Sequence, residues 1–370
     1  SFVKISGISR SWEQYKEKIV SLRYLMEDVI AGLYGEKIPL IYLIINETSK
    51  INLFIGTYQI KRHDKALQTH ENLSTLTTTL QSAYPGIDLQ KEEFILQDMI
   101  KNLNYAGIMI GTPTVKVGSE EVGVEQIERL IRGMYGTRWA YVLIATPIDE
   151  QDIVKLYNST LNELRIIEDA ERSAIMQSPI AEKYKKLLDV FLKKIEIGKT
   201  QGMWHTAVYF LSQDVRAFNH AKAIVKSVFG GEESYPDPVR VLECHNLKEK
   251  ICQFAQIITP APQSPGQVQY PFKYLSILNS KELTSLVHLP TVEMPGYFVR
   301  DDARFDVASH YKGKGSAIEI GEIIDRGNRM GYKYQIELKR LNRHGLIVGA
   351  TGSGKTNTIF HLLRQIWQMG

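Results

Sequence analysis

The sequence predicts an α/β protein that ends in a strand–glycine loop–helix unit. Three observations support this fold class. Apolar, strand-like runs alternate with helical periodicity up to about residue 147 and again from residue 201. A long amphipathic stretch separates these two regions. Near the C-terminus, a glycine-rich segment lies between an apolar run and a second helical pattern.

Composition sets broad limits on the fold and on the function. The 370 residues are enough for two or three domains, and 44% hydrophobic with 23% charged residues is typical of a globular protein. The net charge of +4 permits nucleic-acid binding without requiring it. Cys244 and Cys252 lack CxxC spacing, which favours free thiols in a reducing, cytoplasmic compartment. The longest apolar run, around Ile41–Ile45, is too short to cross a bilayer, so no membrane insertion is predicted.

Residues 1–147 are predicted to form an N-terminal α/β domain. Residues 1–34 are expected to be mainly helical, because Trp12, Tyr15, Ile19 and Leu22 recur at roughly helical spacing. Further along, the pattern predicts strands at 38–46, 51–58, 105–111 and 139–146, with helices near 71–83 and 122–135. Turns are expected at Tyr84-Pro85-Gly86 and at 111–113.

Residues 148–200 are predicted to form a helical hairpin. Ile153, Leu156, Leu161 and Leu164 keep a helical period, which Ser178-Pro179 interrupts before the pattern resumes. Several lysines in this hairpin could face a phosphate backbone, although a solvated helix face is the favoured interpretation. They are Lys183, Lys185, Lys186, Lys193 and Lys194.

Residues 201–258 are predicted to form a second α/β half. A strand at Met203–Leu211, a helix at Val215–Phe229 and a strand at Val239–Leu242 follow one another. Tyr235-Pro236 precedes the last strand much as Tyr84-Pro85 precedes Ile87–Leu89. The order strand, helix, Tyr-Pro, strand therefore occurs twice, which predicts two related βαβ repeats of a ferredoxin-like kind.

Residues 259–274 read as a Pro-rich linker. The segment 275–340 then reads as β-rich, with a short helix at Ser280–Leu289 and an antiparallel pair formed by Ala317–Ile324 and Tyr332–Leu338. The last predicted segment, 341–370, begins a further domain.

Within this last segment, the run from Gly349 to Thr356 has the G-x-x-x-x-G-K-[ST] spacing of a phosphate-binding loop. Leu346–Val348 is predicted as a buried parallel strand entering the loop, and Ile359, Leu362 and Ile366 lie on one face of the helix after it. The predicted ATP-binding residues are Gly349, Thr351, Gly352, Ser353, Gly354, Lys355, Thr356 and Asn357. Of these, Lys355 would contact the β- and γ-phosphates, and the Thr356 hydroxyl would bind Mg²⁺; these two are the predicted catalytic residues.

The position of the loop near Gly370 leads to a further expectation. A phosphate-loop domain needs more strands, which carry the acidic Mg²⁺ residue and the groups that activate water. We therefore expect the sequence to be a piece of a longer protein, and this segment alone to be inactive in hydrolysis. The start at Ser1 without methionine agrees with trimming.

Two other signals have simpler explanations. Tyr141–Ala145 followed by Asp149-Glu150 imitates the acidic strand end of a magnesium site, but a helix cap explains the acidic pair better. Gly313-Lys-Gly315 reads as a hairpin turn, and His63 and His70 read as solvated side chains.

The run from Arg343 through the loop to Thr358 resembles the entry to the motor domain of HerA/FtsK-superfamily ATPases, closest to HerA-type helicases and conjugation ATPases. Asn279–Pro290 followed by Pro295-Gly296 is similar to conjugation-type members. The resemblance covers about residues 275–370. It implies the start of a RecA-like domain, ATP and Mg²⁺ as cofactors, a hexamer with nucleotide between subunits, and double-stranded DNA as the substrate.

In the family, such proteins work with a nuclease or another effector in DNA processing or anti-phage defence. The resemblance thus implies an ATP-driven DNA translocase. Two alternatives stay open: a nucleotide-gated scaffold that assembles an effector without pumping DNA, and a conjugation or secretion ATPase.

Overall fold

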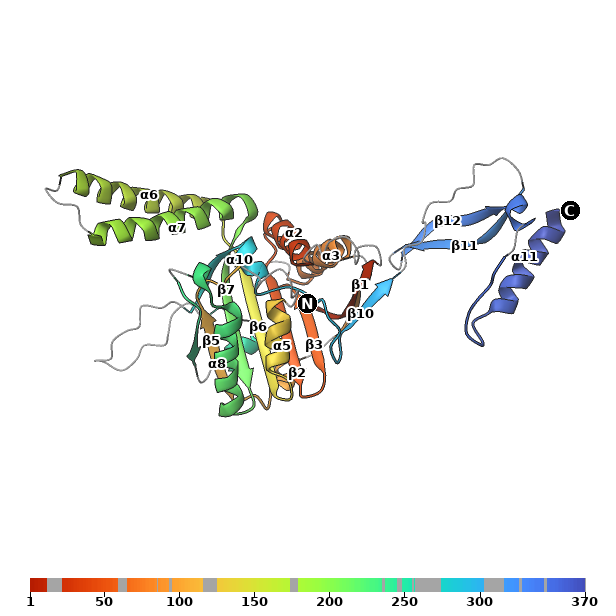
Figure 1. Cartoon of the computed structure of the whole chain (residues 1–370), viewed down its shortest axis with the longest axis horizontal. Helices are drawn as coiled ribbons and strands as arrows, with labels where there is room; N and C mark the ends of the chain where they lie inside the picture. Colours follow the sequence, from red (N-terminus) through yellow and green to blue (C-terminus); the bar gives the residue numbers. More distant parts are fainter. Residues whose placement is uncertain are drawn as a thin grey trace. The chain divides into compact units, whose positions relative to one another are not determined.

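The computed structural model describes the chain except residues 12–21, 59–64, 85, 93–94, 116–124, 174–178, 235–236, 245–247, 255, 257–273, 303–315, 326–327, 343–344 and 370. The chain forms two compact units, Ser1–Asp301 and Asp302–Gly370 (Figure 1).

The first unit is built on one large sheet. Its strands are β1 (Phe2–Ser11), β2 (Leu40–Glu47), β3 (Ile51–Gly56), β4 (Asp88–Lys91), β5 (Tyr105–Ile110), β6 (Arg138–Pro147), β7 (Met203–Ser212), β8 (Arg240–Glu243), β9 (Ser276–Asn279) and β10 (Phe298–Asp302). The order across the sheet is β10-β1-β3-β2-β6-β7-β5-β8, with β4 beside β1 and β9 beside β7. Each pair whose register is described runs antiparallel.

The centre of the sheet is apolar on both faces. In β2, Leu40–Asn46 are all buried, and β6 and β7 have similar runs from Trp139 to Ala145 and from Thr206 to Ser212. Tyr42 pairs with Leu143, and Leu143 pairs with Val208, so side chains of one parity line up across the strands. A sheet buried on both faces must be covered on both.

Helices cover one face of this sheet (Figure 1). They are α2 (Leu22–Gly35), α3 (Lys65–Ala83), α5 (Gln126–Gly133), α8 (Val215–Phe229) and α10 (Ser280–Thr284). The short helices α4 (Leu96–Met99) and α9 (Lys248–Cys252) contribute to the smaller core on the other face. The short turn η1 (Glu232–Ser234) follows α8. The unit is therefore a three-layered α/β structure on a mainly antiparallel sheet.

Helices α6 (Glu150–Ser173) and α7 (Pro179–Gln201) lie side by side, as the sequence predicts for a hairpin (Figure 1). Asp149 directly precedes α6, and its carbonyl accepts from the Asp152 and Ile153 N–H groups. This position supports the helix-start interpretation of the Asp149-Glu150 pair over the magnesium one.

The segment after α10 is fastened to the core by tyrosine hydroxyls. Tyr42 donates to the His288 carbonyl at 2.8 Å, and Tyr141 donates to the Leu286 carbonyl at 3.0 Å. Both rings are fully buried in the sheet. Burial raises the pKa of both phenols, so they stay protonated and act as donors.

The expected helical character of residues 1–34 is wrong for their first part. Phe2–Ser11 forms strand β1, which pairs with β3 and β4, and α2 begins only at Leu22. Val3 and Ile5 are buried while Lys4 is partly exposed, which is the alternation of a strand. Trp12, Tyr15 and Ile19 lie outside the described residues.

Other sequence predictions for this unit agree with the structure. The strands expected at 38–46, 51–58, 105–111, 139–146 and 203–211 are β2, β3, β5, β6 and β7. The six-segment domain division stays a prediction. The structure does not describe the proline of either Tyr-Pro turn or most of the Pro-rich linker. Gly313–Gly315 and His63 also lie outside the described residues.

The second unit contains a β-hairpin, a short turn and a helix. Strands β11 (Ala317–Asp325) and β12 (Asn328–Glu337) pair antiparallel, as the sequence predicts, with Ile318 opposite Ile336. The turn η2 (Leu338–Asn342) follows, and the helix α11 (Lys355–Met369) ends the described chain.

The buried parallel strand expected at Leu346–Val348 is not formed. These residues have no regular secondary structure, and the Leu346 and Val348 side chains are 86% and 76% exposed. A strand needs a neighbouring strand to complete its backbone hydrogen bonds, and no described segment pairs with this run.

A glycine at the start of β7 provides a test of this packing. Gly202 has φ +103°, and a Cβ there would lie 2.3 Å from the Tyr34 ring; Gly136 has φ +78° with open space around it. We expect Gly202→Ala to lower the free energy of unfolding by about 2–5 kcal/mol, since backbone strain and a ring clash add. Gly136→Ala should cost only about 1–2 kcal/mol. Urea unfolding of both variants measures this, and equal losses would contradict the packing described here.

Candidate functional site

The glycine-rich loop turns directly into α11, which begins at Lys355. Gly352 and Gly354 have φ of +83° and +85°, a backbone region that side chains disfavour. The Thr358 N–H donates to the Gly354 carbonyl at 3.0 Å. The N–H groups of Lys355, Thr356 and Asn357 precede this bond, so they belong to the helix start, where backbone donors lack intrahelical partners.

The loop is folded tightly on itself. A Cβ on Gly349 would lie 2.4 Å from the Ser353 hydroxyl oxygen, and the Ser353 N–H donates to the Ala350 carbonyl at 3.2 Å. A side chain at position 349 would therefore require the Ser353 hydroxyl to move. The tight bend and the helix N-terminus together form the kind of concave backbone surface that binds anionic phosphates.

Lys355 reaches back over the loop. Its ammonium donates to the Gly349 and Ala350 carbonyls, each at 2.7 Å. An ammonium has three donors, so it can satisfy loop carbonyls and an anion together. The Lys355 charge is therefore held beside the Gly349–Ala350 end of the loop.

The other predicted loop residues lie around this lysine. Thr351, Gly352 and Ser353 are exposed in the turn, and Thr356 and Asn357 are exposed in the first turn of α11. The structure thus brings all the predicted loop residues together, and they fit the phosphates of a nucleotide. Thr356 would hold Mg²⁺ through its hydroxyl. Among the described residues, no group of three or more His, Cys, Asp or Glu side chains could hold a metal ion.

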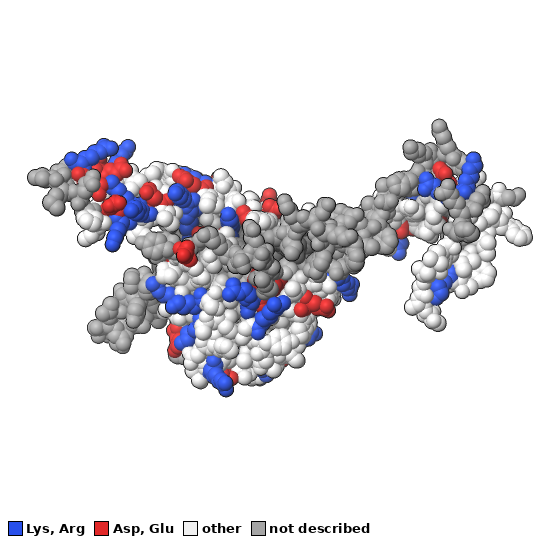
Figure 2. Space-filling model, viewed as in Figure 1, with Lys and Arg blue, Asp and Glu red and all other residues white. Residues whose placement is uncertain are grey.

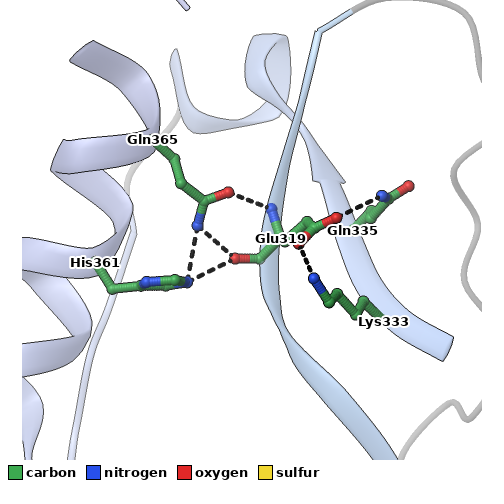
Figure 3. Close-up of polar contacts among 5 residues, drawn as sticks. All are labelled: Glu319, Lys333, Gln335, His361 and Gln365. Carbon is green, nitrogen blue, oxygen red and sulfur yellow. Dashed lines mark hydrogen bonds and ion pairs between the residues drawn. The ribbon is translucent and has the colours of Figure 1, made fainter. Parts of the chain in front are cut away.

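The structure also shows a contact that the sequence analysis missed. Helix α11 is joined to β11 through Glu319 (Figure 3). The Gln365 side chain accepts from the Glu319 N–H at 2.8 Å and donates to the Glu319 carbonyl at 2.7 Å. His361 Nε2 lies 3.1 Å from the same carbonyl. Gln365 therefore pairs with the backbone of β11 as a neighbouring strand residue would.

The carboxylate of Glu319 faces the other way, towards β12 (Figure 3). It pairs with Lys333 at 2.6 Å, and this hydrogen bond lowers the pKa of Glu319. The sequence does show that His361 and Gln365 are four residues apart, so that both lie on one side of a helix and could contact the same neighbour. The sequence could not show which strand they contact.

The hairpin lysines are less available than their number indicates. Lys185 pairs with Glu171, Lys186 with Glu182, and Lys194 with Glu282. Within the described residues, only Lys183 and Lys193 of this group lack an ion pair. These ion pairs weaken the interpretation of the hairpin lysines as a phosphate-facing surface.

Comparison with known families adds to this picture. Residues 318–370 match the model of the family described as Helicase HerA, central domain. The match covers β11, β12, the loop and α11, and it supports a relationship of this segment to HerA/FtsK-type ATPases. It does not extend to the first unit. A search of curated proteins gave no match.

Among the helices that the structure describes, none is long and apolar enough to cross a bilayer.

The contact between α11 and β11 gives a prediction. We expect Gln365→Leu to raise hydrogen exchange at the Glu319 amide about five-fold. The hydrogen bond from the Glu319 N–H to the Gln365 side chain, which contributes about 1 kcal/mol, is lost in this variant. Lys333→Met is the matched control, since it removes only the bond to the Glu319 carboxylate. Exchange measured by NMR should rise in the first variant alone; an equal rise in both would refute the pairing of Gln365 with the strand.

Proposed function

We propose that this protein is an ATP-driven, ring-forming DNA translocase or helicase of HerA type. The observation that carries the proposal is the loop at 349–356, whose lysine lies over the bend in the segment that matches the HerA central domain. In this proposal, residues 341–370 belong to a RecA-like domain. Six copies form a ring, and double-stranded DNA is the substrate. A nuclease or other effector is the partner, in DNA processing or anti-phage defence.

The residues of the chain have distinct roles in this proposal. The backbone N–H groups at the start of α11 bind phosphate oxygens, and Lys355 adds a positive charge beside them. The Thr356 hydroxyl holds Mg²⁺, and Asn357 lies next to the bound nucleotide. Bound ATP supplies a phosphoanhydride whose hydrolysis drives movement along DNA. A cytoplasmic location follows from the proposed DNA substrate.

The contact between α11 and β11 gives the loop a connection to the rest of its unit. Because Gln365 and His361 hold Glu319, a shift of α11 on nucleotide binding would be passed to the β11–β12 hairpin. This hairpin is the element of the second unit best placed to respond to nucleotide.

A second candidate function is a nucleotide-gated scaffold. The size of the first unit favours it, since Ser1–Asp301 forms its own large core. In this alternative, nucleotide binding orders a ring that holds an effector, without DNA pumping.

The nucleotide site can be tested at Lys355. We expect Lys355→Ala to weaken ATP binding roughly 10- to 100-fold in calorimetry, because a charge-assisted hydrogen bond contributes about 1.5–3 kcal/mol. Lys339→Ala is the control, as Lys339 is an exposed lysine of the same unit. Unchanged affinity in Lys355→Ala, or no affinity for ATP in the unaltered protein, would overturn the proposal.

The two candidate functions predict different results for strand displacement on DNA and for binding of the effector. For the translocase, ATP-dependent displacement of a triplex-forming strand should occur with the full-length protein and stop in its Lys355→Ala variant. For the scaffold, the unaltered protein should bind its effector in the presence of nucleotide without any strand displacement. A triplex-displacement assay beside an effector pull-down separates them.

A further inference from the structure

Helices α5 and α8 form one continuous outer surface, here called the α5–α8 face (Figure 1). Both helices pack their apolar sides on the same face of the sheet, with Ile127 and Leu130 from α5 and Val225 and Phe229 from α8 in one core. They also meet closely: a Cβ on Gly133 would lie 2.8 Å from Ile224 Cδ1. Their outward residues therefore point away from the sheet on the same side.

The outward residues of this face are basic. Arg129 and Arg132 are exposed on α5, and Arg216, His220 and Lys226 are exposed on α8. The α8 sequence, VRAFNHAKAIVKSVF, contains no Asp or Glu. Figure 2 shows basic side chains gathered over this part of the first unit, with few acidic ones among them.

The acidic residues of α5 are turned inwards. Glu128 is fully buried and accepts hydrogen bonds from the Thr291 N–H and hydroxyl and from the Glu125 N–H. Burial raises the pKa of Glu128, which disfavours a negative charge beneath the face. Glu125 is also buried, at the helix start.

Acidic residues also lie around α8. Asp214 accepts from the Ala217 N–H at 2.8 Å and so caps the helix, while Glu243 pairs with Lys222. Glu232 lies beyond the C-terminal end, in η1. The pKa of Asp214 is lowered by the hydrogen bond from the Ala217 N–H and, to a smaller extent, by the nearby charge of Arg216, so Arg216 has a carboxylate close by. Within the described residues, none of Arg129, Arg132 and Lys226 has an ion pair, and their charges stay uncompensated at the surface.

We propose that the α5–α8 face binds the phosphate backbone of duplex DNA, at a place separate from the nucleotide loop. This inference rests on the DNA substrate of the proposed function. Guanidinium groups match the geometry of phosphate oxygens, and the 15 residues of α8 extend for about 22 Å, long enough to reach several phosphates. Asn219 lies exposed among the cations and can donate to the same backbone.

The composition of the face favours phosphate over an acidic protein. Protein interfaces of high affinity usually contain a buried apolar or aromatic anchor at their centre. The exposed positions along the middle of α8 are instead Asn219, His220, Ala223, Lys226 and Ser227. Binding through backbone phosphates is independent of base sequence and sensitive to salt.

The test is the salt dependence of duplex binding. Fluorescence anisotropy of the full chain with a short mixed-sequence duplex, without nucleotide, gives the slope of log Kd against log salt. We expect replacement of Arg129, Arg132 and Lys226 by Gln to reduce the size of this slope by about 3, because each phosphate contact contributes about 0.9. The matched control replaces Arg165, Lys183 and Lys193, which are exposed on the α6–α7 hairpin, by Gln. It should leave the slope unchanged.

Three outcomes would overturn the inference. The first is an unchanged slope in the variant of the α5–α8 face, and the second is an equal reduction of the slope in both variants. The third is a variant of the α5–α8 face that no longer binds poly-glutamate, an acidic polypeptide, but still binds the duplex as the unaltered protein does. Thermal unfolding of both variants shows whether the fold survives. Lys355→Ala separates this inference from the proposed function: it should weaken ATP binding and leave the duplex slope as in the unaltered protein.

Discussion

Burial of both faces of the central strands is the constraint on which the first unit depends. Leu40–Ile45, Trp139–Ala145 and Thr206–Leu211 are apolar or buried at nearly every position, and antiparallel pairing satisfies their backbone groups. Apolar strands of this kind are stable only when both faces are covered. Helices α2, α3, α5, α8 and α10 meet this need on one face, while α4 and α9 help to meet it on the other.

The same constraint determines what the surface presents. Because α5 and α8 give their apolar residues to the core, their remaining positions face outwards, and there the sequence has placed arginine, histidine and lysine. Glu128 is the exception, because its side chain faces inwards. It binds Thr291, which follows closely after the residues whose carbonyls accept from Tyr42 and Tyr141. The charge of the surface and the packing beneath it are therefore linked.

Much of this architecture could be predicted from the sequence, and the misses have physical causes. The long apolar strands and the α6–α7 hairpin have strong periodicity. The strand β1 was missed because the helical spacing of Trp12, Tyr15 and Ile19 was extended over Phe2–Ser11, although Val3 and Ile5 alternate as in a strand. Leu346–Val348 has the composition of a buried strand, but composition cannot supply the pairing partner that a strand needs. The loop residues were identified from spacing alone, because glycine and lysine are needed there for local reasons. Long-range polar contacts, such as Gln365 with Glu319, leave no comparable local signal.

The position of Lys355 has an energetic consequence. Its ammonium has two carbonyl partners, from Gly349 and Ala350, and these hydrogen bonds stabilise the bend of the loop. In the proposed function, a phosphate group would meet a loop that is already ordered, and little further conformational entropy would be lost on binding. On binding, the oxygens of the anion would replace part of the contact between the Lys355 nitrogen and the Gly349 and Ala350 carbonyl oxygens. Selectivity in such an exchange depends on the charge of the incoming oxygens, so neutral sugars and bases alone would gain little there.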